Sequence, residues 1–351
     1  MLEEEGAQVR VAGVEVRTLT DGGQPAEETA HALAEFVSAA KETLEIAVYD
    51  FRLPPDLEAI VGGALVAAQQ RGVAVRLAYN LDHAKVVPPP PITDPGAVEA
   101  MPFPTIAIPG VPDLMHHKYV VRDAASVWSG STNWTADSWT REENLIATVD
   151  SEPVAARYRD DFEQLWTTRT VARSGKLDTA PVDGMRAWFC PGRGEKLAHR
   201  IAKAIGSARR RIRIASPVIS SAPILGTLAQ VASDGKVDLA GVVDATQVAE
   251  VLQQWHENGN ADWKGPLLRT VLDRSPFTGK RSTPYAPGSV HDYMHAKVTV
   301  ADDTIFVGSF NLSHSGELNA ENVLELEDPQ LADRLAAFVD EVRLRYATVA
   351  L

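Results

Sequence analysis

The chain carries the same polar motif twice, at the same relative place in each half, and this repeat constrains its fold more than any other feature. One copy lies in MHHKYVVRDAASVWSGSTNWT, residues 115–135, and the other in MHAKVTVADDTIFVGSFNLS, residues 294–313. Each copy reads His-x-Lys-x4-Asp followed by Gly-Ser-x-Asn, and each continues to a Glu-Asn pair. A pattern of this length that recurs in register is not accidental, so the chain contains one folding unit written twice.

The hydrophobic pattern around the motifs repeats as well. Each half begins with helix, strand, helix, strand, where helical spacing falls within 26–40, 57–71, 196–208 and 223–234 and strand patterns fall within 44–51, 73–80, 210–216 and 236–244. Each half also ends in an amphipathic helix, over 151–166 and 328–342. The polar stretch 169–184 is rich in turn formers and predicts two domains, 1–178 and 179–351. Alternating strands and helices indicate an α/β fold, with one mixed or largely parallel sheet per half covered on both faces.

Charge, cysteine content and hydropathy exclude several classes of protein. The 34 Lys and Arg residues against 47 Asp and Glu leave a net charge of −13, which disfavours a broad electrostatic contact with nucleic acid. A single cysteine, Cys190, excludes an internal disulfide framework and a zinc ribbon. The first residues lack the basic start and apolar run of a secretory signal, and no run of about 18 apolar residues occurs. The sequence therefore predicts a cytoplasmic protein with no transmembrane segment.

The spacing within each motif predicts which side chains share a face. Residues two apart on a strand point the same way, so each half presents an imidazole beside an ammonium. The paired side chains are His116 with Lys118 and His295 with Lys297. Asp123 and Asp302 follow at the turn after the strand, where we expect them to order the hairpin or a neighbouring side chain. The rest of each motif supplies the side chains expected on a substrate phosphate: Ser131, Asn133, Ser309 and Asn311.

Two such pairs facing one cleft would carry out phosphoryl chemistry without a metal or another cofactor. The lysines and asparagines would surround one phosphate and stabilise the charge that develops on pentacoordinate phosphorus. One neutral histidine would attack phosphorus to form a covalent phosphohistidine, and the other would protonate the leaving alkoxide and then deprotonate the incoming water or alcohol. These roles need different protonation states, which a carboxylate on the far ring nitrogen can establish. We expect Glu143 and Glu321 to be those carboxylates.

The two motifs, with their Gly-Ser-x-Asn and Glu-Asn continuations, resemble those of the bilobal phospholipase D superfamily over both halves, nearly end to end. The resemblance implies two tandem αβαβα sandwich lobes related by a pseudo-twofold axis, with the active site at the seam, and phosphodiester hydrolysis or transfer through phosphohistidine. It implies that His116 is the nucleophile and His295 the acid and base, although the internal symmetry leaves the opposite assignment open. It also counts Lys118, Asp123, Lys297 and Asp302 with the catalytic motifs. Because one chain carries both motifs, no obligate oligomer is required.

Other hypotheses stay open at this point. The MHHK sequence also resembles the motif of nuclease members, so a metal-independent nuclease acting on DNA or RNA is the second hypothesis, and a non-catalytic protein that binds a phosphate ligand is the third. A metal site formed by His116, His117, His291 and His295 is disfavoured, because neighbouring residues on a strand diverge and the lysines repel a cation. His117 should instead support packing on the opposite face. The remaining histidines are interpreted as structural: His31, His83, His199, His256 and His314.

Two long insertions bear on the choice of substrate. Residues 81–113 are proline-rich without a regular pattern, and their apolar side chains suit an acyl chain, a membrane surface, or packing against the other half: Val86, Val87, Ile92, Met101, Phe103, Ile106 and Ile108. Residues 244–293 interleave aromatic and cationic side chains that could stack bases or hold lipid headgroups: Trp255, Trp263, Tyr285, Lys264, Arg269, Arg274, Lys280 and Arg281. We therefore expect a phosphodiester substrate, with a phospholipid headgroup ester ahead of nucleic acid, and peripheral contact with a membrane as one way of reaching it.

Overall fold

The computed structural model describes residues 10–11, 13–81, 98–259, 261–286 and 288–349. The strands of the first half are β1 (Arg10–Val11), β2 (Val14–Leu19), β3 (Thr43–Val48), β4 (Phe51–Arg52), β5 (Ala74–Leu81), β6 (Thr105–Pro109), β7 (Lys118–Arg122), β8 (Ser126–Gly130), β9 (Trp134–Thr135) and β10 (Asn144–Asp150). Its helices are α1 (Ala26–Ser38), α2 (Pro55–Gln70), α4 (Ala136–Thr140) and α5 (Glu152–Thr168), and the 3-10 turn η1 (Val171–Arg173) follows.

The second half repeats this series. Its strands are β11 (Met185–Phe189), β12 (Arg211–Ala215), β13 (Asp238–Asp244), β14 (Phe277–Lys280), β15 (Val298–Ala301), β16 (Thr304–Gly308) and β17 (Asn322–Glu327). Its helices are α6 (Gly194–Ser207), α7 (Ala222–Asp234), α8 (Ala245–Asn258), α9 (Lys264–Arg274), α10 (His314–Leu318) and α11 (Pro329–Leu344). The helices and strands expected from the hydrophobic pattern are present, and β2 and β11 are strands that the pattern did not predict.

The two large sheets have the same strand order. The first runs β1-β2-β10-β8-β7-β3-β5-β6 and the second β11-β17-β16-β15-β12-β13-β14, so after β1 the strands correspond one for one. In each sheet three strands are parallel, β3-β5-β6 and β12-β13-β14, and the other pairs of the two sheets are antiparallel. The chain is therefore a duplication with a mixed sheet in each half.

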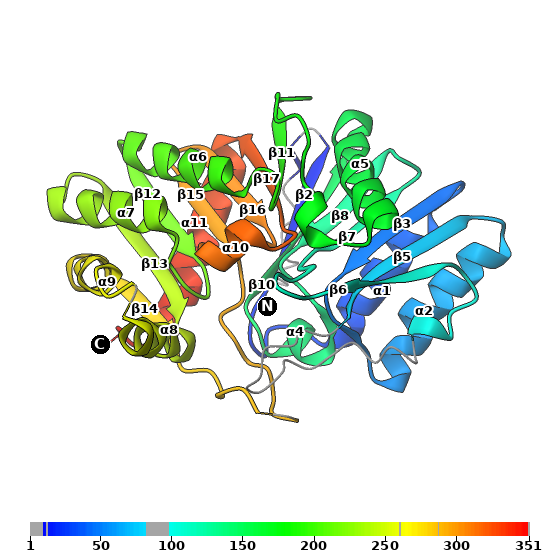
Figure 1. Ribbon diagram of the computed structural model, residues 1–351, viewed down its shortest axis with the longest axis horizontal. Helices are drawn as coiled ribbons and strands as arrows, with labels where there is room; N and C mark the ends of the chain where they lie inside the picture. The colour runs from blue at the N-terminus through cyan, green and yellow to red at the C-terminus, as the bar shows by residue number, and fades with distance from the viewer. Residues whose placement is uncertain (1–9, 12, 82–97, 260, 287, 350–351) are drawn as a thin grey trace, which may run out of the picture.

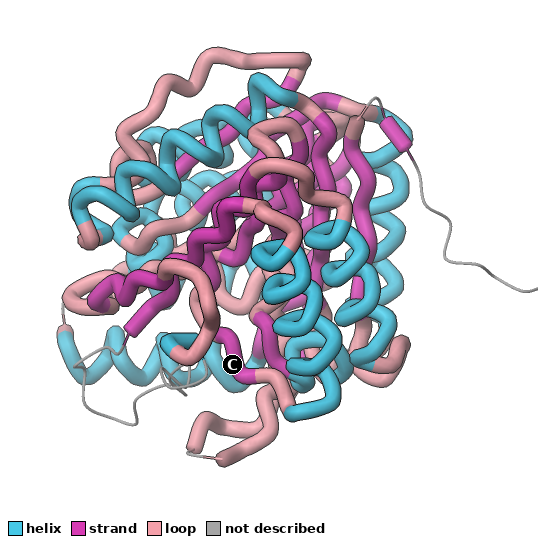
Figure 2. Tube along the Cα trace, turned by 90° about the vertical axis from the view of Figure 1, so that its right-hand side faces the viewer, coloured by secondary structure: helices cyan, strands magenta, loops and turns pink. Residues whose placement is uncertain are grey.

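Five layers stack across the molecule (Figure 1). Helices α1 and α2 form a core with the outer face of the first sheet, and α6, α7, α8 and α9 do the same for the second sheet. Helices α5 and α11 lie between the sheets, and the inner faces of both sheets share one continuous core with them. Figure 2, viewed from the side of the first half, shows helices packed along the strands of the sheets. This order of helix, sheet, helix, sheet, helix confirms the expected αβαβα sandwich.

The two central helices begin in the same way. Ser151 accepts a hydrogen bond from Val154 N at 3.3 Å at the start of α5, and Asp328 accepts one from Leu331 N at 2.8 Å at the start of α11. Each helix also has a proline in its first turn, where the missing N–H costs nothing. The matching caps fix where each half turns from its last sheet strand into the layer between the sheets. No helix among the described residues is both long and apolar enough to cross a bilayer.

The expectation that residues 81–113 lack regular structure is wrong for the part that the structure describes. β6 pairs in parallel with β5 from Leu77 to Leu81 and extends the first sheet by one strand. Phe103, Ile106 and Ile108 are buried in the sheet cores, so they do not form an exposed surface for a lipid. Residues 82–97, which include His83, Val86, Val87 and Ile92, lie outside the described residues.

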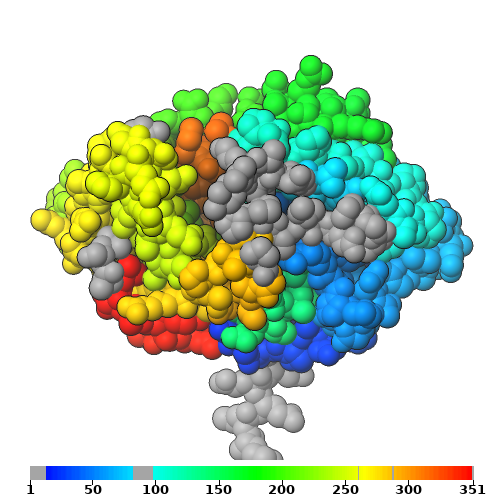
Figure 3. Space-filling model, turned by 60° about the horizontal axis from the view of Figure 1, so that its bottom comes forward, coloured from blue at the N-terminus to red at the C-terminus, as the bar shows by residue number. Residues whose placement is uncertain are grey.

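The second insertion, 244–293, is also largely regular, because it contains α8, α9 and β14. Trp255 and Lys280 are buried, and Trp263 is exposed. Burial therefore removes Trp255 and Lys280 from any surface that could bind bases or headgroups, and the interpretation of the other aromatic and cationic residues stays a prediction. Figure 3 shows that the end of this insertion, coloured gold, lies where the two halves meet, and there His291 N donates to Asp137 Oδ2 of the first half at 3.0 Å.

Candidate active site

The backbone brings the two motif histidines together across the seam. His116 N donates to Ala320 O at 2.9 Å, and His295 N donates to Glu143 O at 3.1 Å, so each histidine is held by a segment of the other half. These contacts belong to two short bridges, Met115 with Ala320 and Glu143 with Met294. The ring centroids of His116 and His295 lie 6.4 Å apart, and both residues are buried. Two imidazoles that are distant in sequence therefore meet in one place.

The two motif lysines lie beside these rings in equivalent positions. Lys118 Nζ donates to His116 O at 2.6 Å, and Lys297 Nζ donates to His295 O at 2.6 Å. Lys118 Nζ also lies 4.7 Å from the centre of the Tyr49 ring. Burial lowers the pKa of Lys118 to about 7 and lowers the pKa of Lys297 well below its usual value. Burial thus disfavours the charged form of both lysines, and an anion bound beside them would favour it.

A pocket of about 190 Å³ opens above the histidines. His116, His295, Asn133 and Asn311 line it, together with Tyr49, Asp50, Glu142, Pro217, Gln247, Tyr285, His291 and Tyr293. The side-chain oxygens of Asn133 and Asn311 are buried and find no hydrogen-bond partner within the described part of the chain. Because buried amides normally have partners, two unsatisfied amides on one pocket indicate a polar ligand there.

His116 contacts a carboxylate from the other half. Its Nδ1 lies 2.8 Å from Glu321 Oε1 and 2.9 Å from Oε2, and Ser309 Oγ donates to Glu321 Oε2 at 2.6 Å. Burial raises the pKa of Glu321 to about 7, although Lys118 and Ser309 oppose this shift. Burial also lowers the pKa of His116 well below its usual value, with the two lysines adding to the effect. The ring is therefore neutral at pH 7, with Nδ1 occupied and Nε2 left for chemistry.

The expectation that Glu143 contacts His295 is wrong. His295 Nδ1 lies 3.2 Å from Asn144 Oδ1 and 3.4 Å from Glu142 Oε2. The reason is the register of one sheet pair: Gly130 pairs with Ile146 but Gly308 pairs with Val323, so the first half has one extra residue between the two paired positions. The extra residue puts Asn144, and not Glu143, in the position that Glu321 occupies in the other half.

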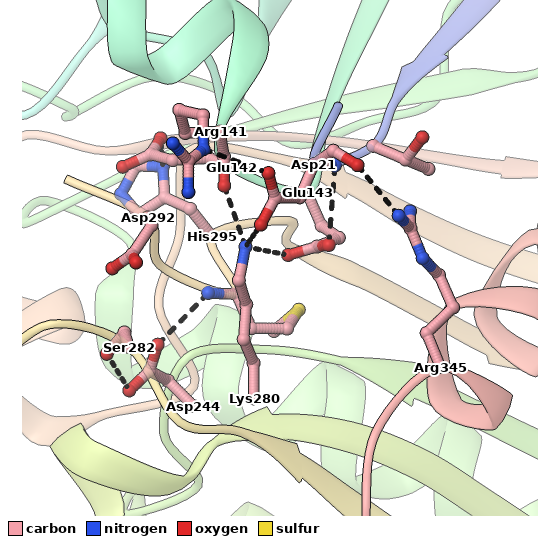
Figure 4. A network of polar contacts seen from close by, with 12 residues as sticks. Asp21, Arg141, Glu142, Glu143, Asp244, Lys280, Ser282, Asp292, His295 and Arg345 are labelled. Atoms are coloured by element: carbon pink, nitrogen blue, oxygen red, sulfur yellow. Dashed lines mark hydrogen bonds and ion pairs between the residues drawn. The ribbon is translucent and has the colours of Figure 1, made fainter. Parts of the chain in front are cut away.

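Glu143 points away from the histidines into a buried ionic network (Figure 4). Lys280 Nζ donates to Glu143 Oε2 at 3.0 Å and to Arg141 O at 2.7 Å, and it lies 3.1 Å from Asp21 Oδ2. Tyr346 donates its hydroxyl proton to Glu143 Oε1. Glu143 thus anchors the segment that carries Glu142 and is not itself next to a ring nitrogen of His295.

The motif serines do not face the pocket, contrary to their predicted role on the phosphate. Ser131 is buried, donates to Asn144 Oδ1 at 2.6 Å and accepts from Leu145 N at 2.9 Å. Ser309 is buried, donates to Glu321 and accepts from Asn322 N at 3.0 Å. Each hydroxyl therefore holds the group that contacts a histidine of the opposite half.

Comparison with known proteins agrees with this geometry. A family model described as cardiolipin synthase, PLD-like domain, matches residues 33–166 and 201–343. The chain belongs to the phospholipase D-like family. Human mitochondrial cardiolipin hydrolase is 27% identical over 172 residues, which are 46% of this chain and 61% of that protein. The corresponding hydrolase of Xenopus tropicalis is 31% identical over 130 residues, 36% of this chain and 56% of that protein. The chain thus spans about three-fifths of the length of these curated relatives.

A solved structure shows that the likeness extends over both halves. Phosphatidylserine synthase of Haemophilus influenzae Rd KW20 superposes with a TM-score of 0.66, at 13% identity, and covers 94% of this chain and 86% of that one. At that identity the likeness concerns the fold. The fold is therefore shared with that protein over nearly the whole of this chain.

The motif aspartates of this phospholipase D-like chain are structural caps. Asp123 accepts backbone hydrogen bonds from Lys41, Glu42 and Thr43 at 2.7 to 3.1 Å. Asp302 accepts the corresponding bonds from Arg209, Arg210 and Arg211 at 2.8 to 3.1 Å. These backbone donors lower the pKa of both carboxyls. Asp123 orders the loop before β3 and Asp302 orders the loop before β12, as expected from the turn, and neither aspartate lines the pocket.

Several pocket residues lie outside the two motifs. Tyr49 follows β3, and its ring centroid lies 4.8 Å from that of His116. Tyr285, His291 and Tyr293 come from the irregular end of the second insertion, where neighbouring ring centroids lie 5.9 and 5.4 Å apart. Glu142 and Asn144 could not be identified by aligning the two motifs, because the alignment matches Glu143 with Glu321. The shift of one residue appears only in the sheet register.

His117 is buried on the opposite side of the strand from His116. Its Nδ1 lies 3.2 Å from Asn322 Nδ2, and its Nε2 lies 3.0 Å from Asp161 Oδ2. His117 therefore supports the packing between the halves, as expected from the alternation of a strand. Within the described ranges, no group of three or more His, Cys, Asp or Glu side chains could hold a metal ion.

Proposed function

We propose that this protein is a metal-independent phosphodiesterase that cleaves phospholipid headgroup esters through a covalent phosphohistidine. The observation that carries the proposal is the meeting of His116 and His295, with ring centroids 6.4 Å apart, between two buried lysines. Lys118, Lys297, Asn133 and Asn311 supply the positive charge and the amide groups that a pentacoordinate phosphorus requires.

The first step uses the free nitrogen of each ring. Glu321 holds Nδ1–H of His116, so Nε2 attacks phosphorus and forms a P–N bond. The P–O bond to the leaving group breaks, and the leaving oxygen takes the proton from Nε2 of His295. Entry of the phosphate anion offsets the positive charge of the lysines and favours the protonated form of His295 before this transfer.

The second step reverses the proton transfer. Water, or an alcohol, gives a proton to Nε2 of His295 while its oxygen attacks phosphorus. The P–N bond then breaks, and His116 is released with its electron pair. Hydrolysis yields a phosphomonoester, and an alcohol yields a new diester, so one site supports both hydrolysis and transfer.

The relatives and the size of the pocket support the proposed substrate class. The matching family model is described as a cardiolipin synthase domain, and the curated relatives are cardiolipin hydrolases. A pocket of about 190 Å³ accepts a phosphate with a small alcohol, which leaves the apolar part of a lipid outside. A net charge of −13 opposes a long polyanion, so nucleic acid ranks second. Peripheral contact with a lipid surface is part of this proposal.

Purified protein tests the substrate and the metal independence together. Vesicles of cardiolipin, phosphatidylglycerol or phosphatidylcholine, and single- and double-stranded DNA, are incubated with it in EDTA, and the released products are quantified. We expect phospholipid turnover that EDTA does not reduce and that His116→Ala abolishes. Turnover of DNA alone would reverse the ranking of substrates, and loss of all activity in EDTA would overturn the metal-free mechanism.

The covalent intermediate has its own test. In His295→Asn, a p-nitrophenyl diester can still react because its leaving group needs no proton, but the second step lacks its base. We expect an acid-labile adduct on His116 that intact-protein and peptide mass spectrometry can locate. An adduct on another residue would contradict the assignment of His116 as nucleophile.

A further inference from the structure

The segments that hold the two histidines carry the same pair of groups in opposite order. Glu143 O and Ala320 O accept the equivalent hydrogen bonds from His295 N and His116 N, so these two residues correspond in the fold. They are flanked by Glu142 and Asn144 in the first half but by Asn319 and Glu321 in the second. Carboxylate and amide have therefore exchanged places around a pseudo-twofold axis.

In the second half the carboxylate is the group in direct contact with the histidine ring. Both oxygens of Glu321 lie within 2.9 Å of His116 Nδ1. Asn319 stays behind it, donating through Nδ2 to Glu321 Oε1 at 3.4 Å and accepting from Leu114 N at 2.9 Å. The ring of His116 thus contacts a full negative charge.

In the first half the amide is the group nearest to the histidine ring, and hydrogen bonds fix the orientation of this amide. Asn144 Nδ2 donates to Ser138 O at 2.9 Å, to Ser138 Oγ at 3.1 Å and to Glu142 Oε2 at 2.9 Å. The amide oxygen must therefore face His295 Nδ1, 3.2 Å away. Glu142 Oε2 is 3.4 Å from that nitrogen and receives the Ser138 hydroxyl proton at 2.8 Å. The ring of His295 thus contacts a neutral acceptor first and shares its carboxylate with two other donors.

Buried polar contacts hold both the segment that carries Glu142 and the segment that carries His295 (Figure 4). Lys280 fixes the segment next to Glu142 through Arg141 O and Glu143. Asp244, which accepts from Ser282 Oγ at 2.7 Å, also accepts from Met294 N at 3.0 Å, next to His295. The weaker contact with His295 is therefore a built geometry between two fixed segments.

A carboxylate in direct contact with Nδ1–H increases the basicity of Nε2, which suits a nucleophile, whereas a neutral amide leaves the protonated ring a stronger acid. We propose that this exchanged order divides the roles of the histidines, with Glu321 activating His116 for attack and the Asn144–Glu142 pair positioning His295 as the acid. Glu142 is then a positioning residue for proton transfer to the leaving group. The inference rests on the proposed phosphodiester cleavage and deepens it.

Two substrates that differ only in the leaving group separate the two roles. A p-nitrophenyl diester departs without a proton, whereas the choline of a short-chain phosphatidylcholine needs one. We expect Glu142→Gln to lower kcat/KM by about 10²-fold for the choline ester but by less than about threefold for the p-nitrophenyl ester. Glu321→Gln should lower both by similar factors, because both substrates need the nucleophile. The ratio of the two rates does not depend on the fraction of folded protein.

Two further variants complete the design. Glu143→Gln changes an adjacent buried carboxylate that contacts neither ring, so any loss should be equal for the two substrates. The reciprocal variant, Glu142→Asn with Asn144→Glu, copies the order of the second half and should lower kcat/KM more for the choline ester than for the p-nitrophenyl ester, because a carboxylate at Nδ1 makes protonated His295 a weaker acid. Equal losses for both substrates in Glu142→Gln, or a dependence on the leaving group in Glu321→Gln instead, would overturn the inference. Wild-type protein that turns over neither substrate would overturn the proposed function itself.

Discussion

At the scale of single residues, the groups that make this site reactive are also buried charges that the fold must hold. Lys118, Lys297, Glu142 and Glu321 are buried between the two halves, where water cannot solvate them. Their hydrogen bonds are made to other groups of the site. For example, the two lysines donate to the backbone carbonyl oxygens of His116 and His295. The charge state of these residues therefore sets both the pH dependence of activity and part of the stability.

The pH profile of the wild type should be bell-shaped with a maximum near pH 7. Burial raises the pKa of Glu321 to about 7, so on the acid side Glu321 takes up a proton and no longer holds Nδ1–H of His116. Burial lowers the pKa of Lys118 to about 7, so on the alkaline side Lys118 loses the charge that contacts phosphate. We expect Glu321→Gln to remove the acid limb and to lower kcat/KM by about 10²-fold or more at pH 7. An unchanged acid limb in that variant, measured with a soluble diester, would show that another group controls it.

Replacing the buried Lys118, which the proposed mechanism places on the phosphate, should stabilise the protein while it abolishes activity. The folded pKa of Lys118, about 7, lies below its unfolded value of 10.5, so between these values the unfolded state binds more protons and stability rises with pH. Lys118→Met removes that penalty, and we expect a gain of about 1–3 kcal/mol in the free energy of unfolding at pH 7. Urea denaturation measures it, and Lys203→Met on the exposed face of α6 is the control, with an expected change near zero. A loss of stability in Lys118→Met would mean that its hydrogen bonds outweigh its desolvation.

At the scale of elements, the site depends on two hairpins placed by equivalent caps. Asp123 and Asp302 adopt φ of 53° and 54°, and each bonds to three successive backbone N–H groups before the central strand. The central strand of each sheet pairs with the strand that follows the motif histidine, β3 with β7 and β12 with β15. The caps therefore fix the strand pair next to the histidine without entering the pocket.

The caps should matter for stability and little for chemistry. We expect Asp123→Ala to lower the free energy of unfolding by about 2 kcal/mol, because three backbone donors lose their acceptor and alanine is strained at positive φ. Asp123→Asn should cost less, since asparagine tolerates this backbone and retains an acceptor. The pKa of Asp123 is lowered in the folded state, so its contribution is present above the unfolded value near 4 and is lost as pH falls through the lower folded value. Circular dichroism in urea at pH 3 and pH 7 checks both statements, and a large loss of kcat at low temperature would contradict them.

At the scale of the whole molecule, neither half contains a complete site. His116 takes its carboxylate from Glu321, and His295 takes its amide from Asn144, so each ring depends on the other half. The inner faces of both sheets also share one core with α5 and α11. The predicted boundary between residues 178 and 179 therefore separates two sequence units whose folding and chemistry are coupled.

Separating the halves tests this coupling. We expect 1–178 and 179–351, expressed alone, to be inactive and poorly soluble, because each would expose the apolar inner face of its sheet. Co-expression of the two pieces should restore diester hydrolysis, measured against the intact chain. Activity in either piece alone would show that a single motif, paired with a second copy of itself, is sufficient.

The sequence could predict the parts of the site that recur. The two histidines, the two lysines and the duplicated order of helices and strands follow from local spacing, which a repeat makes conspicuous. It could not predict that Glu142 and Asn144 replace Glu143 beside His295, because that depends on one extra residue between Gly130 and its sheet partner Ile146. It also missed Tyr49, which reaches the pocket from a segment without a motif, and it did not place Tyr285 or His291 beside the two catalytic-motif histidines. It placed Ser131 and Ser309 on the phosphate, whereas burial turns their hydroxyls to the groups behind the histidines.

By itself, the sequence determined the fold class, the duplication and the residue types that carry the chemistry, because hydrophobic period and motif spacing are local properties of the chain. Only the tertiary structure decided which groups contact each ring nitrogen. Those contacts cross between the halves, and their register depends on sheet pairing and on the length of one connection. A shift of one residue exchanges a carboxylate for an amide, and the physical difference between the two histidines comes from that exchange.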